Sequence, residues 1–190
     1  FGFTSAAHYA AMSIRNIGAD ARSTKAWYVL EIMGRKAGWL TYAAGIAGEA
    51  TRMISVEDCD DVFDARAEAE ELVDLMLHRE SDGRRYGIIC IAEGAVPVGG
   101  RMTVARTLAD SPDPIRLGGV GEHLRAMLEP HLRSEVRTTL LGHVQRGGTP
   151  TAFDRVLATR FGHAAAQLAM RGDFGRMVAL QADACVSVPL

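Results

Sequence analysis

The stretch LLGHVQRGGTPTAFDR, residues 140–155, joins the end of an apolar segment to the start of an expected helix. His143 and Arg146 follow the apolar segment closely, and two glycines come directly after them. Thr149 is of a type that caps helices and Pro150 is favoured in a first helical turn, so a long helix is expected to begin there. Cationic side chains, exposed backbone and a helix start at one point are typical of a site for a negatively charged group.

The rest of the chain alternates between apolar strands and amphipathic helices. The expected strands are 27–33, 52–56, 86–92, 136–142 and 175–180, with 184–190 extending or pairing with the last one. The expected helices are 4–17, 36–50, 61–80 and 120–128, and the helix from Thr149 has Phe153, Leu157, Phe161, Ala164 and Leu168 on its buried face. Strands that are apolar throughout are buried on both faces. The alternation therefore predicts an α/β fold, a mostly parallel sheet with helices on both faces.

Polar residues follow three of the expected strands, at the ends where parallel sheets bind ligands. Gly34 and Arg35 follow the first strand, Glu93 follows the third, and His143 and Arg146 follow the fourth. Each group alone also fits an ordinary turn, a helix cap or a structural histidine, but their occurrence at one sheet edge favours a shared site. Arginine forks bind oxyanions and a carboxylate accepts hydrogen bonds from hydroxyl groups. The set therefore predicts a site for a phosphorylated sugar or polyol.

Composition restricts the class of protein. The chain has 190 residues, of which 48% are hydrophobic and 23% charged, as in an ordinary globular domain. Its net charge of -2 does not favour nucleic-acid binding, and no apolar run approaches the ~20 residues of a membrane-spanning helix. The cysteines Cys59, Cys90 and Cys185 are too widely spaced to suggest a disulfide framework or a metal site. A reducing, cytoplasmic location is therefore expected, with neither nucleic acid nor membrane as a partner.

Three segments carry a resemblance to a known family: MGRKAGW (33–39), IAEG (91–94) and RTTLLGHVQRGGTPTAFDR (137–155). Together they resemble the 6-phosphofructokinase family. The third segment follows that family's signature in order and spacing, with a basic residue, Gly-His, Gln-Arg-Gly-Gly and Asp-Arg. FGFTSA at the start and GRMVAL near the end also fall where the family has similar segments, so the resemblance covers nearly the whole chain.

The resemblance implies how the strand ends would bind fructose 6-phosphate. Met33, Gly34 and Arg35 would contact the sugar phosphate, and Arg35 would also stabilise the charge of the transferred phosphoryl group. Glu93 would accept hydrogen bonds from the sugar hydroxyls. These roles fit phosphoryl transfer, which depends mostly on positioning and charge neutralisation.

The resemblance also implies a shared active site. His143 and Arg146 would bind the 6-phosphate, and Arg137 would reach the same phosphate in the site of a neighbouring subunit, so a homo-oligomer is expected. The family places a further arginine seven residues before the Met of MGR, where this chain has Ala26. The adjacent Lys25 would project from the opposite side of an extended strand.

As a family member the chain would act in glycolysis, in phosphoryl transfer from ATP or pyrophosphate to the 1-hydroxyl of fructose 6-phosphate. The family's Gly-rich phosphate loop and its Thr-Ile-Asp-Asn-Asp segment are not found in the sequence, which also begins without methionine. Residues 1–190 are therefore expected to be the fructose 6-phosphate-binding portion, inactive alone, with residues 93–116 as a loop excursion. The donor-binding region would precede residue 1, and Mg²⁺ would arrive with the donor, on ligands outside this chain.

The choice of donor and two other interpretations stay open at this point. AWYVLEIMGR (26–35) and the long segment between Glu93 and Arg137 favour pyrophosphate slightly over ATP. The chain could instead be a non-catalytic regulatory half or subunit of the same family that binds a phosphosugar. A third interpretation is an unrelated α/β module for sugar phosphates.

Overall fold

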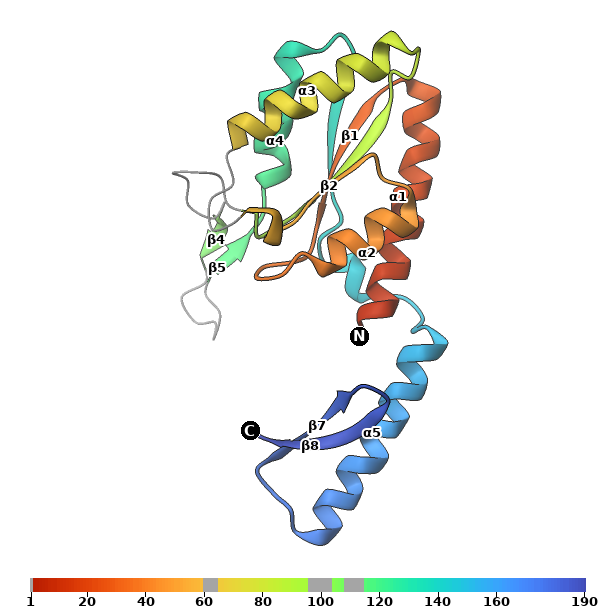
Figure 1. The fold of residues 1–190 in the computed structure, drawn as a ribbon, viewed down its shortest axis with the longest axis vertical. Helices are drawn as coiled ribbons and strands as arrows, with labels where there is room; N and C mark the ends of the chain where they lie inside the picture. Colours follow the sequence, from red (N-terminus) through yellow and green to blue (C-terminus); the bar gives the residue numbers. More distant parts are fainter. Residues whose placement is uncertain (1, 60–64, 96–103, 108–114) are drawn as a thin grey trace. The chain divides into compact units, whose positions relative to one another are not determined.

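The computed structural model describes residues 2–59, 65–95, 104–107 and 115–190 (Figure 1). Contacts within the chain divide it into two units. The larger unit is Ala6–Gly148 and holds a parallel sheet with its helices. The smaller unit combines Phe1–Ser5 with Thr149–Leu190 and holds a long helix and a hairpin.

A four-stranded parallel sheet forms the centre of the larger unit. Its strands, in spatial order, are β2 (Arg52–Ile54), β3 (Gly87–Ala92), β1 (Trp27–Ile32) and β6 (Val136–Leu140). β1 and β3 are buried along their whole length, as expected for apolar strands inside a parallel sheet. The register pairs Trp27 with both Gly87 and Val136, so these strands start together and their carboxyl ends lie at one edge.

Helices cover both faces of this sheet (Figure 1). They are α1 (Phe3–Thr24), α2 (Trp39–Gly48), α3 (Ala65–Ser81) and α4 (Val120–Leu128), with short 3-10 helices η1 (Glu57–Cys59), η2 (Glu129–His131) and η3 (Gly142–Arg146). α1 and α2 pack on the face that carries Leu30 and Ile32, whereas α3 and α4 pack on the face that carries Trp27 and Val29. The predicted α/β fold with helices on both faces is confirmed, and α4 has the bounds expected from the sequence.

The segment expected to be a loop excursion, residues 93–116, contains two short strands. β4 (Val104–Thr107) and β5 (Ile115–Leu117) pair antiparallel in a sheet of their own. Strands of four and three residues are too short to leave a readable hydrophobic period, which is why the sequence did not reveal them. Residues 96–103 and 108–114 lie outside the described part of the chain.

The smaller unit contains α5 (Ala152–Arg171) and the antiparallel strands β7 (Arg176–Gln181) and β8 (Ala184–Pro189). The expected helix start at Thr149 and Pro150 is wrong by two residues. Thr151 is the cap, with an extended backbone and a hydroxyl oxygen that accepts the Asp154 amide at 3.4 Å. The Asp154 carboxylate in turn accepts the amide of Ser5 at 2.8 Å and its hydroxyl at 2.5 Å. Asp154 thus stabilises the start of α5 through its bonds to Ser5 and Thr151.

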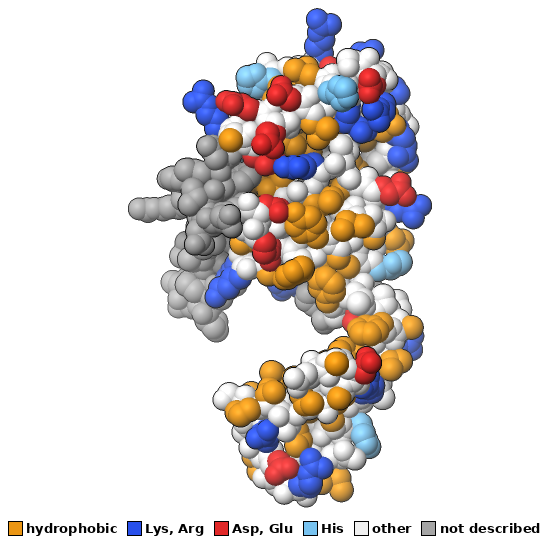
Figure 2. All heavy atoms as spheres, in the orientation of Figure 1, with side chains coloured by type: hydrophobic (Ala, Val, Ile, Leu, Met, Phe, Trp, Pro, Cys, Tyr) orange, Lys and Arg blue, Asp and Glu red, His pale blue; other side chains and the backbone are white. Residues whose placement is uncertain are grey.

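The smaller unit buries little of its own surface. Leu168 is buried as predicted, Leu157, Phe161 and Ala164 are half-buried, and Phe153 is 57% exposed. Figure 2 shows hydrophobic side chains reaching the surface of this unit. Among the helices in the described ranges, none combines the length and apolar character needed to cross a bilayer.

Candidate functional site

Hydrogen bonds join the carboxyl ends of β1 and β3. The Glu93 amide donates to the carbonyl of Ile32 at 2.8 Å, and the Gly94 amide donates to the carbonyl of Gly34 at 3.0 Å. The Gly34 amide donates to Glu93 Oε1 at 3.3 Å. Two residues that are 59 positions apart in the sequence therefore lie in contact, at the edge where both were expected.

The carboxyl end of β6 is joined to the same place through Gln145. This side chain is 1% exposed and lies in η3, the turn that carries His143 and Arg146. Gln145 Oε1 accepts the Met33 amide at 3.4 Å, and Gln145 Nε2 donates to the carbonyl of Gly142 at 3.0 Å. Gln145 was given no role from the sequence. Its place in a short polar turn after a buried strand was the available signal.

Two glycines allow the backbones of these strand ends to approach closely. A Cβ atom on Gly94 would lie 2.1 Å from the carbonyl oxygen of Arg35 and 2.6 Å from that of Gly34. A Cβ atom on Gly34 would lie 2.6 Å from the carbonyl oxygen of Ala37. The obstacles are backbone atoms, which cannot move aside as a flexible side chain can.

Replacing Gly94 with alanine is expected to separate the ends of β1 and β3. The added methyl group needs space held by the Arg35 backbone, so the free energy of unfolding should fall by about 1–3 kcal/mol. Chemical denaturation of both chains measures this change. Gly162→Ala is the control: a Cβ atom there meets nothing within 4 Å, and alanine suits its place in α5, so this chain should be at least as stable as the wild type. An unchanged stability of Gly94→Ala would contradict the close approach.

Two arginines and a histidine start from the joined strand ends. Arg35 directly follows Gly34 and is half-buried, and His143 and Arg146 lie on η3 on either side of Gln145 and are exposed. Glu93 adds a half-buried carboxylate that can accept hydrogen bonds. The set can neutralise an anionic group and recognise hydroxyl groups beside it.

A family model described as Phosphofructokinase matches residues 1–169. The chain belongs to the phosphofructokinase family. It is 41% identical over its whole length to an ATP-dependent 6-phosphofructokinase 2 of Streptomyces coelicolor, of which it covers 54%. It is also 41% identical to a pyrophosphate--fructose 6-phosphate 1-phosphotransferase of the same organism, of which it covers 53%. The solved phosphofructokinase of Saccharomyces cerevisiae superposes with a TM-score of 0.75 and 28% identity, over 98% of this chain and 23% of that one.

These relatives are enzymes named for phosphofructokinase activity, and the resemblance seen in the sequence is confirmed at the level of the family. The chain spans about half the length of the curated phosphofructokinase relatives it matches.

Arg137 lies away from the other predicted site residues of this phosphofructokinase chain. It is the second residue of β6 and pairs in register with Tyr28, near the amino ends of the strands. Its guanidinium donates to Glu135 at 2.7 Å, to the Tyr28 hydroxyl at 2.8 Å and to Asp20 at 3.3 Å. Hydrogen bonds to Glu135 and Tyr28 raise the pKa of Arg137. Within its own chain, Arg137 therefore does not join the strand-end cluster, which consists of Arg35, Glu93, His143 and Arg146.

Ala26 and Lys25 lie just before β1. Ala26 is 1% exposed and belongs to the core beneath α1 and α2. The Lys25 ammonium lies 5.7 Å from the centre of the Tyr86 ring. This contact places Lys25 against the aromatic ring of Tyr86.

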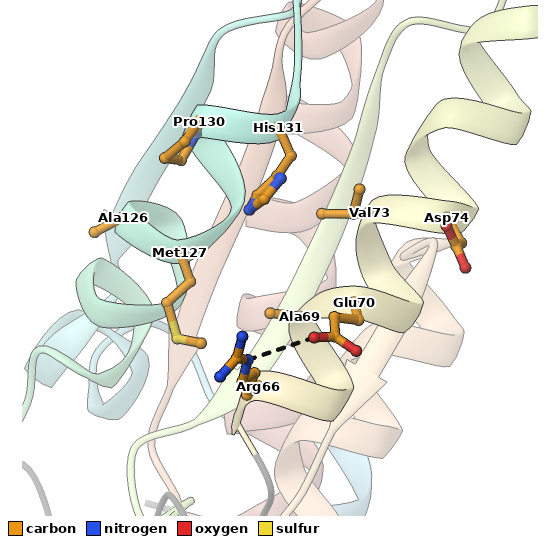
Figure 3. A pocket seen from close by; sticks show the side chains of 9 residues that line it. All are labelled: Arg66, Ala69, Glu70, Val73, Asp74, Ala126, Met127, Pro130 and His131. Carbon is orange, nitrogen blue, oxygen red and sulfur yellow. Dashed lines mark ion pairs between the residues drawn. The ribbon is translucent and has the colours of Figure 1, made fainter.

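A groove of about 490 Å³ lies between α3 and α4 (Figure 3). Ala69, Val73 and Met127 contribute apolar surface to it. Arg66 and Glu70 form an ion pair of 3.5 Å at its side. None of the predicted phosphosugar residues lines this groove, so it is separate from the strand-end cluster.

Within the described ranges, no group of three His, Cys, Asp or Glu side chains could hold a metal ion.

Proposed function

We propose that this chain is the fructose 6-phosphate-binding half of a 6-phosphofructokinase. The complete enzyme would transfer a phosphoryl group from ATP or pyrophosphate to the 1-hydroxyl of the sugar. The observation that carries this proposal is the convergence of three strand ends, through the bond from Gly34 to Glu93 and the bond from Met33 to Gln145. It brings cationic groups and a hydroxyl acceptor to one edge of the sheet.

In the proposed reaction, the sugar 1-hydroxyl oxygen forms a bond to the phosphorus of the terminal phosphoryl group. The bond between that phosphorus and the bridging oxygen of the donor breaks. The hydroxyl proton passes to a base that the family resemblance places outside these residues. This half of the enzyme holds the acceptor: Glu93 binds sugar hydroxyls, His143 and Arg146 bind the 6-phosphate, and Arg35 neutralises charge that develops on the transferred group.

The position of Arg137 supports a shared active site in this proposal. Arg137 is turned to the amino ends of the strands and is 35% exposed, so it can reach another molecule. In a homo-oligomer it would contact the 6-phosphate bound by a neighbouring subunit, as the family resemblance implies. Contact with that phosphate would compete with Glu135 and Asp20 for the guanidinium.

Calorimetric titration of the chain with fructose 6-phosphate tests the proposal. Fructose and inorganic phosphate serve as control ligands, because each carries only one of the two features that the site should recognise. Binding of fructose 6-phosphate well above both controls is expected, and its absence would contradict the proposal. Turnover assays of the complete protein with ATP and with pyrophosphate then identify the donor. Sugar binding without turnover of either donor would favour a regulatory half.

Replacing Glu93 with glutamine is expected to weaken fructose 6-phosphate binding about tenfold. A neutral acceptor replaces a charged one, and hydrogen bonds to charged groups are worth about 1.5 kcal/mol or more. The dissociation constants of the two chains measure the effect. Glu70→Gln makes the same change at an exposed position in the groove between α3 and α4 and should bind like the wild type. Equal affinities of Glu93→Gln and the wild type would remove Glu93 from the site.

A further inference from the structure

A buried carboxylate lies on an inner strand of the central sheet, close to the carboxyl end of that strand. Glu31 is the fifth residue of β1, is 2% exposed, and pairs with Ile91 on one side and Leu140 on the other. Every other residue of β1 is hydrophobic. A carboxylate in such a place is costly unless its oxygens receive hydrogen bonds, so its contacts indicate what it is used for.

One oxygen of Glu31 holds the start of α4. Glu31 Oε2 accepts the amide of Gly119 at 3.0 Å and the amide of Gly121 at 3.1 Å. Gly119 is the cap residue of α4, has a φ of 98°, and offers no side chain to its own helix. The capping group therefore comes from the sheet, and its negative charge suits the positive end of the helix.

The same residue also contacts the strand-end cluster. The Glu31 carbonyl accepts the amide of Leu141, the residue that leads into η3, at 3.3 Å. Side chains two apart on a strand share a face, so Glu93 follows Ile91 on the face where Glu31 lies. Burial, and to a smaller degree the charge of Glu93, raise the pKa of Glu31, whereas the amides of Gly121 and Gly119 oppose this shift.

The second oxygen of Glu31 has no partner among the described residues. Glu31 Oε1 is buried and accepts no hydrogen bond in that part of the chain. Oε2 thus accounts for the anchoring of the helix. An unpaired oxygen in the core is costly, and the capping of α4 by Oε2 does not use it.

We infer that Glu31 is a positioning residue of the phosphosugar site. Its carboxylate fixes Gly119 and Gly121 against β1, next to the strand end where the Gly34 amide donates to Glu93. Glu31 does not touch the sugar in this inference; it acts through Glu93. The inference rests on the proposed function, because it names a residue that supports the acceptor-binding side chains.

Glu31→Ala and Glu31→Gln test the inference, with Glu122→Gln as the matched control. Glu122 is also a carboxylate in the first turn of α4, but it is 57% exposed and bonds to Arg125 and Thr138. Two measurements apply to each chain: the affinity for fructose 6-phosphate, and the hydrogen-exchange rates of the Gly121 and Gly34 amides by NMR. The Gly34 amide reports on Glu93 directly, because it donates to that carboxylate.

Glu31→Ala is expected to speed exchange at both amides and to weaken sugar binding, each about tenfold. Glu31→Gln keeps an acceptor for α4 and should give smaller changes in the same direction, so it decides the matter if the alanine variant does not fold. Faster exchange at Gly121 alone, with Gly34 and the affinity unchanged, would reduce Glu31 to a helix cap and overturn the inference. If the wild type does not bind the sugar, the proposed function fails, and exchange at Gly34 still shows whether Glu31 positions Glu93.

Discussion

Arg35→Ala is expected to lower the turnover number of the complete enzyme by about 10²–10³-fold, the usual effect of losing one donor to charge that develops in the transition state. The Michaelis constant for fructose 6-phosphate should rise much less. Arg35 starts from the joined ends of β1 and β3, and its carbonyl oxygen lies against Gly94. Arg35 therefore starts where backbone hydrogen bonds join two strand ends, beside the other side chains of the proposed site.

Steady-state kinetics with the donor-binding region present measure this effect, because a loss in turnover and a loss in binding separate there. Lys36→Ala is the matched control: it removes a neighbouring cation whose side chain is exposed. The control should keep a turnover number close to that of the wild type. If Arg35→Ala raises the Michaelis constant and leaves turnover unchanged, Arg35 binds the ground state only and its proposed role is wrong.

Arg146→Ala is expected to weaken fructose 6-phosphate binding by about 2–4 kcal/mol, the cost of losing a charge-assisted contact to a bound anion. In dissociation constants this is roughly 30- to 1000-fold. Arg146 lies in η3, whose position is fixed by the bond from the Met33 amide to Gln145. Calorimetry on the chain alone measures the change.

Arg146→Lys separates the charge of this residue from its geometry. Lysine keeps the positive charge but not the planar fork, so its affinity should fall between those of the wild type and the alanine variant. Arg133→Ala removes another exposed arginine, in the segment before β6, and should bind like the wild type. An affinity of Arg146→Ala equal to that of the wild type would show that the 6-phosphate binds elsewhere.

Local patterns predicted most of the fold of the larger unit. The buried strands and α4 were found because an apolar strand or a helical stripe leaves a strong period in a few residues. β4 and β5 are too short to do so. At the start of α5, Thr149 and Thr151 are both suitable capping residues, and only the bond from the Asp154 amide to Thr151 decides between them.

The candidate site was predictable where it depends on strand ends and not where it depends on distant partners. Met33, Gly34, Glu93, His143 and Arg146 follow strands that are parallel, so the topology alone brings them to one edge. Sequence spacing cannot show that Gln145 bonds to Met33, 112 residues away, or that Glu31 bonds to Gly121, 90 residues away.

The buried Glu31 also links folding of the central sheet to proton concentration. Burial and the charge of Glu93 raise the pKa of its carboxyl above the ordinary value of 4.5, so the native chain retains this proton to a higher pH than the unfolded chain does. Between those two pKa values the contribution of Glu31 to the free energy of unfolding declines with rising pH, by at most about 1.4 kcal/mol per pH unit. A rise in pH through this range therefore lowers the stability of the native chain, and the Glu31→Gln chain, which has no carboxyl group at this position, should lack that part of the pH dependence.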